Sequence, residues 1–278
     1  MSARTIRSGA AEIAVESAGQ GPPVVLLHAG VADRRMWRAQ CTALAQAGCH
    51  AHAYDRRGFG DTLHADDAWS HLDDLAAVLD DVAPAEPAIL VGCSQGGRIA
   101  IDAALAHPSR VRALMLVAPA ISGAPSKETF PPAIQAWIDR VERAEAANDV
   151  DAINALEAHA WLDGPLAPEG RVGGATRELF LAMNEIALRA EVRGTQTEPV
   201  EAWNRLSAIR CPMLVAWGDL DFPDVMENCA HLARSLPRAQ RHVFAGAAHL
   251  PNLEQPAPFD RLLVDYCRSV LERLTPAA

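Results

Sequence analysis

The sequence predicts an α/β fold in which a mostly parallel central sheet is flanked by helices. Two observations predict it. Short apolar runs typical of strands alternate with helical patterns through the first 120 residues and again from residue 208 onward. Between these parts, residues 121–207 carry helical patterns only. We therefore expect one core domain made of residues 1–120 and 208–278, with an all-helical cap of residues 121–207 inserted into it.

The strands expected in the first half are short and rich in Val, Leu, Ile and Ala, as is typical of strands buried on both faces. They cover residues 11–16, 23–28, 49–54, 88–91 and 111–117. Helices are expected where apolar residues recur at helical spacing, over residues 36–48, 70–82 and 98–106. Ligands of open α/β sheets bind at the carboxyl ends of the strands, so we expect the functional site at that edge.

The inserted segment contains three expected helices, over residues 131–147, 149–161 and 176–192. A stretch of this length is too long for a loop, so we interpret it as a cap over the strand ends. Strand patterns resume at residues 212–217 and 240–245, and a helix over residues 259–274 closes the chain.

Composition and charge argue against several classes of protein. The 278-residue chain is 50% hydrophobic and 22% charged, with a formal net charge of −10. A nucleic-acid partner requires a cationic surface, so this charge argues against one. The sequence has neither the apolar run of about 18 residues that a membrane span needs nor the apolar core of a secretory signal near its start. We expect a cytoplasmic protein without membrane contact.

The six cysteines are scattered and form no Cys-x-x-Cys pair. Their spacing disfavours a zinc site and a disulfide framework, so we expect reduced thiols. The sequence carries no dinucleotide-binding glycine fingerprint and no cluster of metal-ligating residues. We therefore expect neither a cofactor nor a metal ion.

The run Gly-Cys-Ser-Gln-Gly-Gly at residues 92–97 is the first chemical motif. It lies between an expected buried strand and an expected helix, which is the context of a nucleophile elbow. Such a turn is strained, and its glycines let strand and helix approach each other closely. The helix N-terminus beneath the serine favours negative charge. Ser94 is therefore the candidate nucleophile.

A serine hydroxyl needs a base, and that base needs an orienting acid. His249 follows the last expected strand, while Asp219 and Asp221 follow the strand before it. All of them lie just beyond the carboxyl end of a strand, so they converge with Ser94 on one edge of the sheet. The residues alone leave the acid open between Asp219 and Asp221, with Asp224 as a third choice.

With these motifs the chain resembles the α/β-hydrolase superfamily over its whole length except the expected cap. The resemblance implies that Ser94 is the nucleophile and His249 the general base. It implies Asp221 as the acid, because this residue matches the fourth position of the family's Gly-x-x-Asp arrangement at residues 218–221. The fold it implies is the α/β-hydrolase fold with a helical cap.

The resemblance also implies an oxyanion hole. The segment Leu-Leu-His-Ala-Gly-Val at residues 26–31 is similar to the family's His-Gly-x loop, with Ala29 where the family usually has glycine. The backbone N–H of Gly30, or that of Val31 one position on, would join that of Gln95 to bind the oxyanion. Residues 55–60 resemble the family's Asp-x-Arg-Gly-x-Gly motif, for which we expect a structural turn and an ion pair near the site.

Several large apolar side chains are candidates for an apolar substrate pocket. Val31 and Leu250 follow the oxyanion and histidine motifs, and Trp137 and Trp161 lie in the expected cap. These four are the expected substrate contacts. Other candidates for the same pocket are Trp37, Met183 and Trp203.

The resemblance implies a cofactor-independent serine hydrolase that cleaves a small carboxylic ester through an acyl-enzyme. Lactonases and carbon–carbon bond hydrolases of ring-cleavage products are similar in every motif described above. The second of these is disfavoured by Cys93, because such enzymes often have asparagine at that position. Perhydrolases and cofactor-free haloperoxidases use the same triad. An alternative of another class is a ligand receptor or scaffold without catalytic activity.

Overall fold

A sheet of eight strands forms the centre of the computed structural model, which describes residues 1–273 except 126, 128, 192, 198–200 and 237–238. The strand order is β1-β2-β4-β3-β6-β7-β9-β10. Neighbours from β4 to β10 run parallel, whereas β2 is antiparallel to both β1 and β4. Their bounds are β1 (Ser2–Ser8), β2 (Ala11–Ala18), β3 (Pro23–Leu27), β4 (His50–Tyr54), β6 (Ala88–Cys93), β7 (Val111–Val117), β9 (Met213–Gly218) and β10 (Ala239–Phe244).

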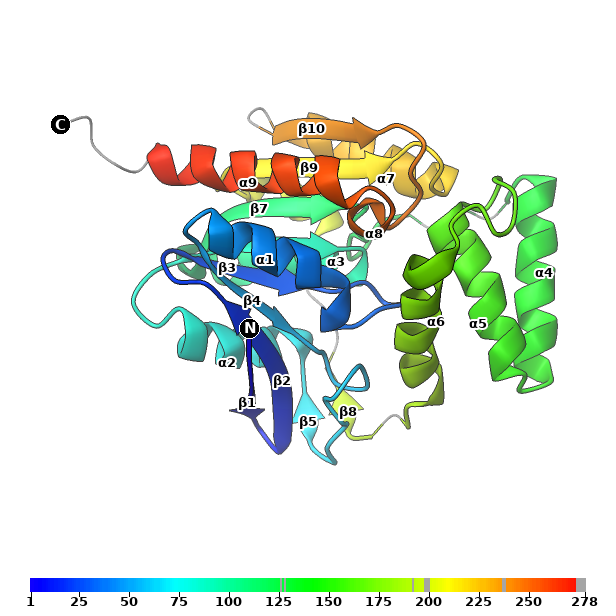
Figure 1. The fold of residues 1–278 in the computed structure, drawn as a ribbon, viewed down its shortest axis with the longest axis horizontal. Helices are drawn as coiled ribbons and strands as arrows, with labels where there is room; N and C mark the ends of the chain where they lie inside the picture. Colours follow the sequence, from blue (N-terminus) through cyan, green and yellow to red (C-terminus); the bar gives the residue numbers. More distant parts are fainter. Residues whose placement is uncertain (126, 128, 192, 198–200, 237–238, 274–278) are drawn as a thin grey trace.

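Helices cover both faces of this sheet (Figure 1). The residues of β3 alternate between the two cores: Val24 and Leu26 belong to one cluster, Val25 and Leu27 to the other. The first cluster also contains residues of α1 (Arg38–Gln46) and α9 (Pro256–Glu272), and the second contains residues of α2 (His71–Val82), α3 (Gln95–Ala106) and α7 (Pro223–Ser235). Burial on both faces explains why the strand sequences are continuous apolar runs.

The segment inserted between β7 and β9 is largely helical rather than all-helical as predicted, because it also contains a short strand. It contains α4 (Pro132–Ala146), α5 (Val150–Ala158), a π-helical turn (His159–Asp163), α6 (Gly174–Arg189) and a 3₁₀ helix (Trp203–Ala208). In Figure 1, α4, α5 and α6 stand together at one end of the molecule, beyond the arrowheads of β7 and β9. A short strand, β8 (Thr195–Gln196), pairs in parallel with β5 (Ala68–Trp69) of the core.

The predicted elements agree closely with those observed. Strand β7 begins and ends at the expected residues, and the helix expected over residues 149–161 is α5 followed by the π-helical turn. The expected ends of two helices, at Val192 and Leu274, lie outside the described residues.

The sequence patterns missed the strands β1, β5 and β8 and the helices α7 and α8 (Pro251–Glu254). In β1, five of the seven residues are exposed, so this strand at the edge of the sheet contains no apolar run. In α7, only Cys229 and Leu232 are fully buried. All six cysteines are free, and five of them are buried. None of the described helices is long and apolar enough to cross a membrane.

Candidate active site

Ser94 occupies a tight turn between β6 and α3. Its φ of 53° and ψ of −116° are unusual for a residue with a side chain. The backbone is held on both sides: the Ser94 N–H donates to the Val117 carbonyl at 2.9 Å, and its carbonyl accepts from the N–H groups of Arg98 and Ala120, both at 3.1 Å. These bonds fix the strained turn between two central strands and the helix.

The glycines around Ser94 are required by space. A Cβ atom on Gly96 would lie 2.3 Å from the Leu27 carbonyl oxygen, and one on Gly92 would lie 2.4 Å from the Gly96 carbonyl oxygen. A Cβ atom on Gly97 would lie 2.7 Å from the Pro119 Cβ. Strand β6, helix α3 and the end of β3 can therefore meet at Ser94 only without these side chains.

Asp221 and His249, the predicted acid and base, lie in contact. His249 Nδ1 lies 2.7 Å from Asp221 Oδ2, and Asp221 Oδ1 accepts from the Phe222 N–H at 2.7 Å. Both side chains are buried. An ionised carboxylate accepts only, so Nδ1 carries the proton and Nε2 keeps its lone pair. Asp219 instead accepts from the Gly246 N–H at 2.7 Å, which gives it a structural partner away from the His249 ring.

The loop that carries His249 is tied to its neighbours by hydrogen bonds. The Leu220 N–H donates to the Ala247 carbonyl at 2.9 Å. The Ala248 N–H donates to the two Glu254 carboxylate oxygens at 2.9 and 3.0 Å. Burial raises the pKa of Glu254, while its bonds to Arg171 and to this N–H oppose that rise.

Arg171, from the inserted segment, completes this arrangement. Its guanidinium bonds to Glu254 and donates to the carbonyls of Gly246 and Leu162, both at 2.9 Å, and to that of Asp163 at 2.6 Å. One side chain thus links the histidine loop to the π-helical turn.

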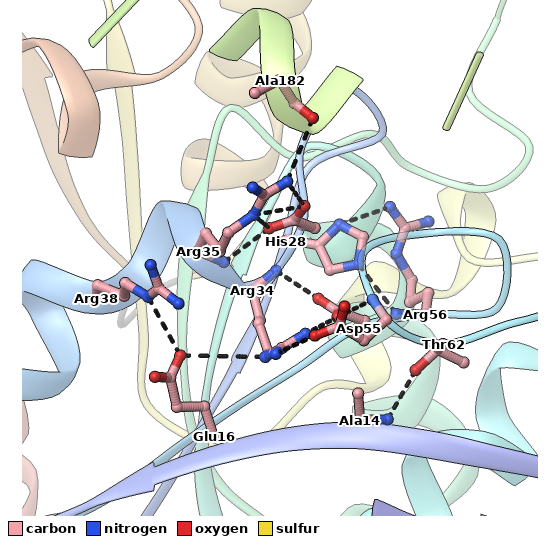
Figure 2. A network of polar contacts seen from close by, with 12 residues as sticks. Ala14, Glu16, His28, Arg34, Arg35, Arg38, Asp55, Arg56, Thr62 and Ala182 are labelled. Carbon is pink, nitrogen blue, oxygen red and sulfur yellow. Dashed lines mark hydrogen bonds and ion pairs between the residues drawn. The ribbon is translucent and has the colours of Figure 1, made fainter. Parts of the chain in front are cut away.

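The oxyanion loop follows β3. Within the described residues, the N–H groups of Gly30, Val31 and Gln95 have no hydrogen-bond acceptor, as an oxyanion hole requires. The N–H of Gly30 and that of Val31 are therefore both available to bind an oxyanion together with that of Gln95. Behind it, Figure 2 displays a polar network that includes His28, Asp55 and Arg56. Burial, assisted by the charge of Arg56, lowers the pKa of His28 well below its usual range, so His28 is neutral.

Two of the expected substrate contacts gather beside His249. The Trp161 ring lies 4.6 Å from the His249 ring and 4.7 Å from the Phe222 ring, centroid to centroid. The Trp137 ring packs on Phe222 at 5.5 Å. The inserted segment therefore contributes an apolar wall next to the histidine.

The other apolar candidates are placed differently. Val31 is half-buried at the oxyanion loop. Leu250, Trp37 and Met183 are completely buried in the core cluster under α1 and α9, and Trp203 stacks on His231 with ring centroids 4.4 Å apart. Substrate contact by Val31 and Leu250 stays a prediction.

A cavity of about 540 Å³ lies between residues 58–64 and the C-terminal part of α6. Ser94, Asp221 and His249 are not among its lining residues, so it is separate from the candidate active site.

Three residues at the site escaped the sequence patterns: Arg56, Arg171 and Glu254. Arg56 lies in the motif of residues 55–60, where an ion pair was expected, and the neighbouring Arg57 does pair with Asp74 at 3.0 Å. Arg56 is the variable position of that motif, so nothing in the motif points to it. Arg171 and Glu254 are 83 residues apart, and no local pattern connects them.

Comparison with known proteins agrees with this geometry. The family model described as the alpha/beta hydrolase fold matches residues 22–256. The chain therefore belongs to the α/β-hydrolase fold family, and it is a hydrolase of this type. The predicted family and fold class are confirmed.

Several relatives extend over almost the whole chain. The pimeloyl-[acyl-carrier protein] methyl ester esterase of Chromobacterium violaceum is 30% identical over 266 residues, covering 91% of this chain and 96% of that protein. The 2-hydroxy-6-oxononadienedioate/2-hydroxy-6-oxononatrienedioate hydrolase of Comamonas testosteroni is 27% identical over 263 residues, covering 91% and 90%. The solved structure of an N-acyl homoserine lactone degrading enzyme superposes with a TM-score of 0.73 at 27% identity, covering 95% of this chain and 100% of that one.

Proposed function

We propose that the protein is a cofactor-independent serine hydrolase that cleaves a small carboxylic ester through an acyl-enzyme. The observation that carries the proposal is the 2.7 Å contact between His249 Nδ1 and Asp221 Oδ2, on the sheet edge where the strained turn presents Ser94. A base oriented by a buried acid, on the same sheet edge as a serine on such a turn, is the arrangement that activates a hydroxyl.

In the first half of the reaction, Ser94 Oγ attacks the ester carbonyl and His249 Nε2 takes the serine proton. The Asp221 carboxylate stabilises the imidazolium that forms. The negative charge on the carbonyl oxygen is bound by the N–H of Gln95 and that of Gly30 or Val31. His249 then gives the proton to the leaving alcohol, and the acyl group remains on Ser94.

In the second half, a water molecule gives a proton to His249 Nε2 and attacks the acyl carbonyl. The same N–H groups bind the second oxyanion. When it collapses, the bond to Ser94 Oγ breaks, the serine regains its proton from His249, and the carboxylic acid leaves.

We assign the inserted segment as a cap that limits the size of the substrate. Its Trp161, packed on the His249 ring, supports this role, and Trp137 extends the apolar surface through Phe222. Such a wall favours an apolar acyl group of modest length. The six free cysteines favour a reducing, cytoplasmic location.

A lactone is the second candidate substrate. It is an ester closed into a ring, so the same steps open it without any new group. The similarity to the lactone-degrading enzyme supports this alternative. Because the chain is also similar to the Comamonas hydrolase, a ketone of the dienedioate type is compared with the esters and lactones.

Initial rates on a matched panel test the proposal. The panel contains p-nitrophenyl esters from acetate to decanoate, several lactones and one vinylogous diketone. We expect the highest kcat/KM among the short esters, and a loss of at least about 10⁴-fold in Ser94→Ala. The matched control is Ser269→Ala on α9, whose hydroxyl bonds to the Tyr266 carbonyl and which should keep full activity. Full activity in Ser94→Ala, with the protein folded, would contradict the proposal.

A further inference from the structure

Arg56 is a completely buried arginine without a carboxylate partner among the described residues. Only 1% of it is exposed, and the adjacent Asp55 is paired with Arg34 instead. Burial lowers the pKa of Arg56 to about 9, so the guanidinium is still charged at neutral pH. Burying a charge without a carboxylate partner is costly unless hydrogen bonds to other groups compensate the lost hydration.

The partners of this guanidinium are the two sides of the candidate oxyanion hole. Nη1 donates to the Gln95 side-chain oxygen, and Nη2 donates to the Ala29 carbonyl at 2.9 Å. The group lies over the Phe59 ring, 4.3 Å from its centroid. Figure 2 displays His28 beside Arg56: its Nε2 accepts from the Arg56 backbone N–H, and its Nδ1 lies 3.1 Å from Nη2.

The contacts of His28 fix its tautomer. Its Nε2 accepts from the Arg56 N–H at 3.0 Å, so the proton of this neutral ring sits on Nδ1. Nδ1 lies 2.8 Å from the Ala29 carbonyl oxygen and donates to it. The Ala29 carbonyl therefore accepts from His28 and Arg56, and from the Ala32 N–H at 3.3 Å.

Holding the Ala29 carbonyl also aims the next N–H. A peptide unit is planar and trans, so the Ala29 carbonyl and the Gly30 N–H point in opposite directions. With the carbonyl held toward Arg56, the Gly30 N–H points away from it, and it has no acceptor among the described residues.

The Gln95 side chain needs restraint for a second reason. Its Oε1 lies beside Gly30, 3.3 Å from the position that a Cβ on Gly30 would take. An unrestrained carbonyl oxygen there would compete for the Gly30 N–H and block the hole. Arg56 binds this oxygen and keeps it occupied.

We propose that Arg56 is a positioning residue that preorganises the oxyanion hole, holding the Ala29–Gly30 peptide and the Gln95 side chain through one guanidinium. The inference rests on the proposed hydrolase function. A planar fork with several donors suits this task, whereas an ammonium group cannot bond to both partners in the same geometry.

Because oxyanion contacts strengthen in the transition state, the effect falls on kcat rather than on KM. Losing one such donor entirely costs about 10²–10³-fold. We expect Arg56→Met to lower kcat by about 10- to 100-fold, since the donors are misaligned rather than removed. KM should stay within about threefold of the wild-type value.

The direct readout is the affinity for phenylboronic acid. This compound forms a B–O bond to Ser94 Oγ, the serine proton moves to His249, and a boronate oxygen takes the oxyanion position. In Arg56→Met we expect its inhibition constant to rise by the same factor as kcat/KM falls, whereas inhibition by the product acid should stay unchanged. Partial unfolding would weaken the binding of both inhibitors, so it would not produce this difference between the boronic acid and the product acid.

Arg56→Lys keeps the positive charge, and it is the variant to measure if Arg56→Met does not fold. We expect it to show the same paired loss of kcat and boronate affinity. The matched control is Arg112→Met, a mostly buried arginine at the opposite end of the sheet, bonded to Glu86 and to the Pro87 carbonyl. It should leave kcat and boronate affinity unchanged.

Wild-type kcat and boronate affinity in a folded Arg56 variant would overturn the inference, as would a loss of kcat without a loss of boronate affinity. The proposed function is judged separately, by ester hydrolysis in the wild type and its loss in Ser94→Ala. Failure of the Arg56 test alone therefore leaves the hydrolase assignment in place.

Discussion

The turn at Ser94 and the loop at His249 lie on the same edge of the sheet, yet they are held by different balances of backbone and side-chain interactions. The turn at Ser94 is fixed by backbone hydrogen bonds and by steric fit, since Gly92, Gly96 and Gly97 each lie where a Cβ atom would collide with a neighbour. The loop at His249 is also packed closely, since a Cβ atom on Gly218 would lie 2.1 Å from the Ala247 carbonyl oxygen, but most of its hydrogen bonds come from the side chains of Asp219, Glu254 and Arg171.

This difference determines what each region tolerates. A backbone packed without free space cannot accept another atom, so changes there should act on folding. Hydrogen bonds from side chains can be lost one at a time, so changes around His249 should act on activity with smaller effects on stability. The following predictions test this division, beginning with the largest effect.

Among the changes around His249, Asp221→Asn should have the largest effect on activity. An amide in place of the acid favours the wrong tautomer of His249 and removes the charge that stabilises its protonated form. We expect kcat to fall by about 10³–10⁴-fold with the fold retained. Asp219→Asn is the matched control, because an asparagine oxygen can still accept from the Gly246 N–H. Equal losses in the two variants would make Asp219 a second acid and refute the assignment.

Gly96→Ala should destabilise the protein most. Its Cβ would lie 2.3 Å from the Leu27 carbonyl oxygen, which is backbone and cannot rotate away. We expect the free energy of unfolding to fall by at least about 3 kcal/mol, measured by denaturant titration. Gly173→Ala provides the comparison, since nothing lies within 4 Å of its added Cβ. A stable Gly96→Ala protein would show that the turn has room.

Arg171→Met should act mainly on turnover. The variant loses the bonds that join Glu254 and Gly246 to the π-helical turn. We expect kcat to fall by about 10-fold, because His249 and Trp161 are less well positioned. The exposed Arg143→Met on α4 should be neutral. An unchanged kcat in Arg171→Met would show that the histidine loop does not depend on the inserted segment.

Asp102→Asn should give the smallest effect, a pH-dependent gain in stability. Burial raises the pKa of Asp102, on α3, from 3.8 to about 6. The folded state therefore holds this proton more tightly than the unfolded state, and wild-type stability falls as pH rises from about 4 to about 6. The always neutral Asn variant should melt higher than the wild type at pH 8, and the advantage should shrink toward pH 4. A pH-independent difference, as expected of the exposed Asp265→Asn control, would contradict this reasoning.

The features that could be predicted from the sequence are those set by local motifs and by the strand order. Ser94 and its glycines form a local motif between two regular elements, and β6 and α3 were expected around it. The Asp221 and His249 loops were recognisable because each follows a predicted strand, and the order of the strands then brings them together.

Contacts that depend on distant side chains could not be predicted in this way. Arg56 meets Gln95 across 39 positions of the sequence, and Arg171 meets Glu254 across 83. No periodicity or spacing in the sequence indicates such pairs, since they form only where loops that follow different strands come together in the fold. Strand β1 was missed for another reason: most of its side chains are exposed, so the apolar pattern on which a prediction depends is absent.

Trapping of the acyl-enzyme is the most direct test of the central claim, that Ser94 carries the acyl group during turnover. The enzyme is mixed with p-nitrophenyl butyrate, quenched in acid within milliseconds and digested, and the modified residue is located by mass spectrometry. We predict a burst of nitrophenol of about one equivalent per chain, with the butyryl group on Ser94. Turnover with neither a burst nor an adduct, or an adduct on Cys93 instead, would contradict the account.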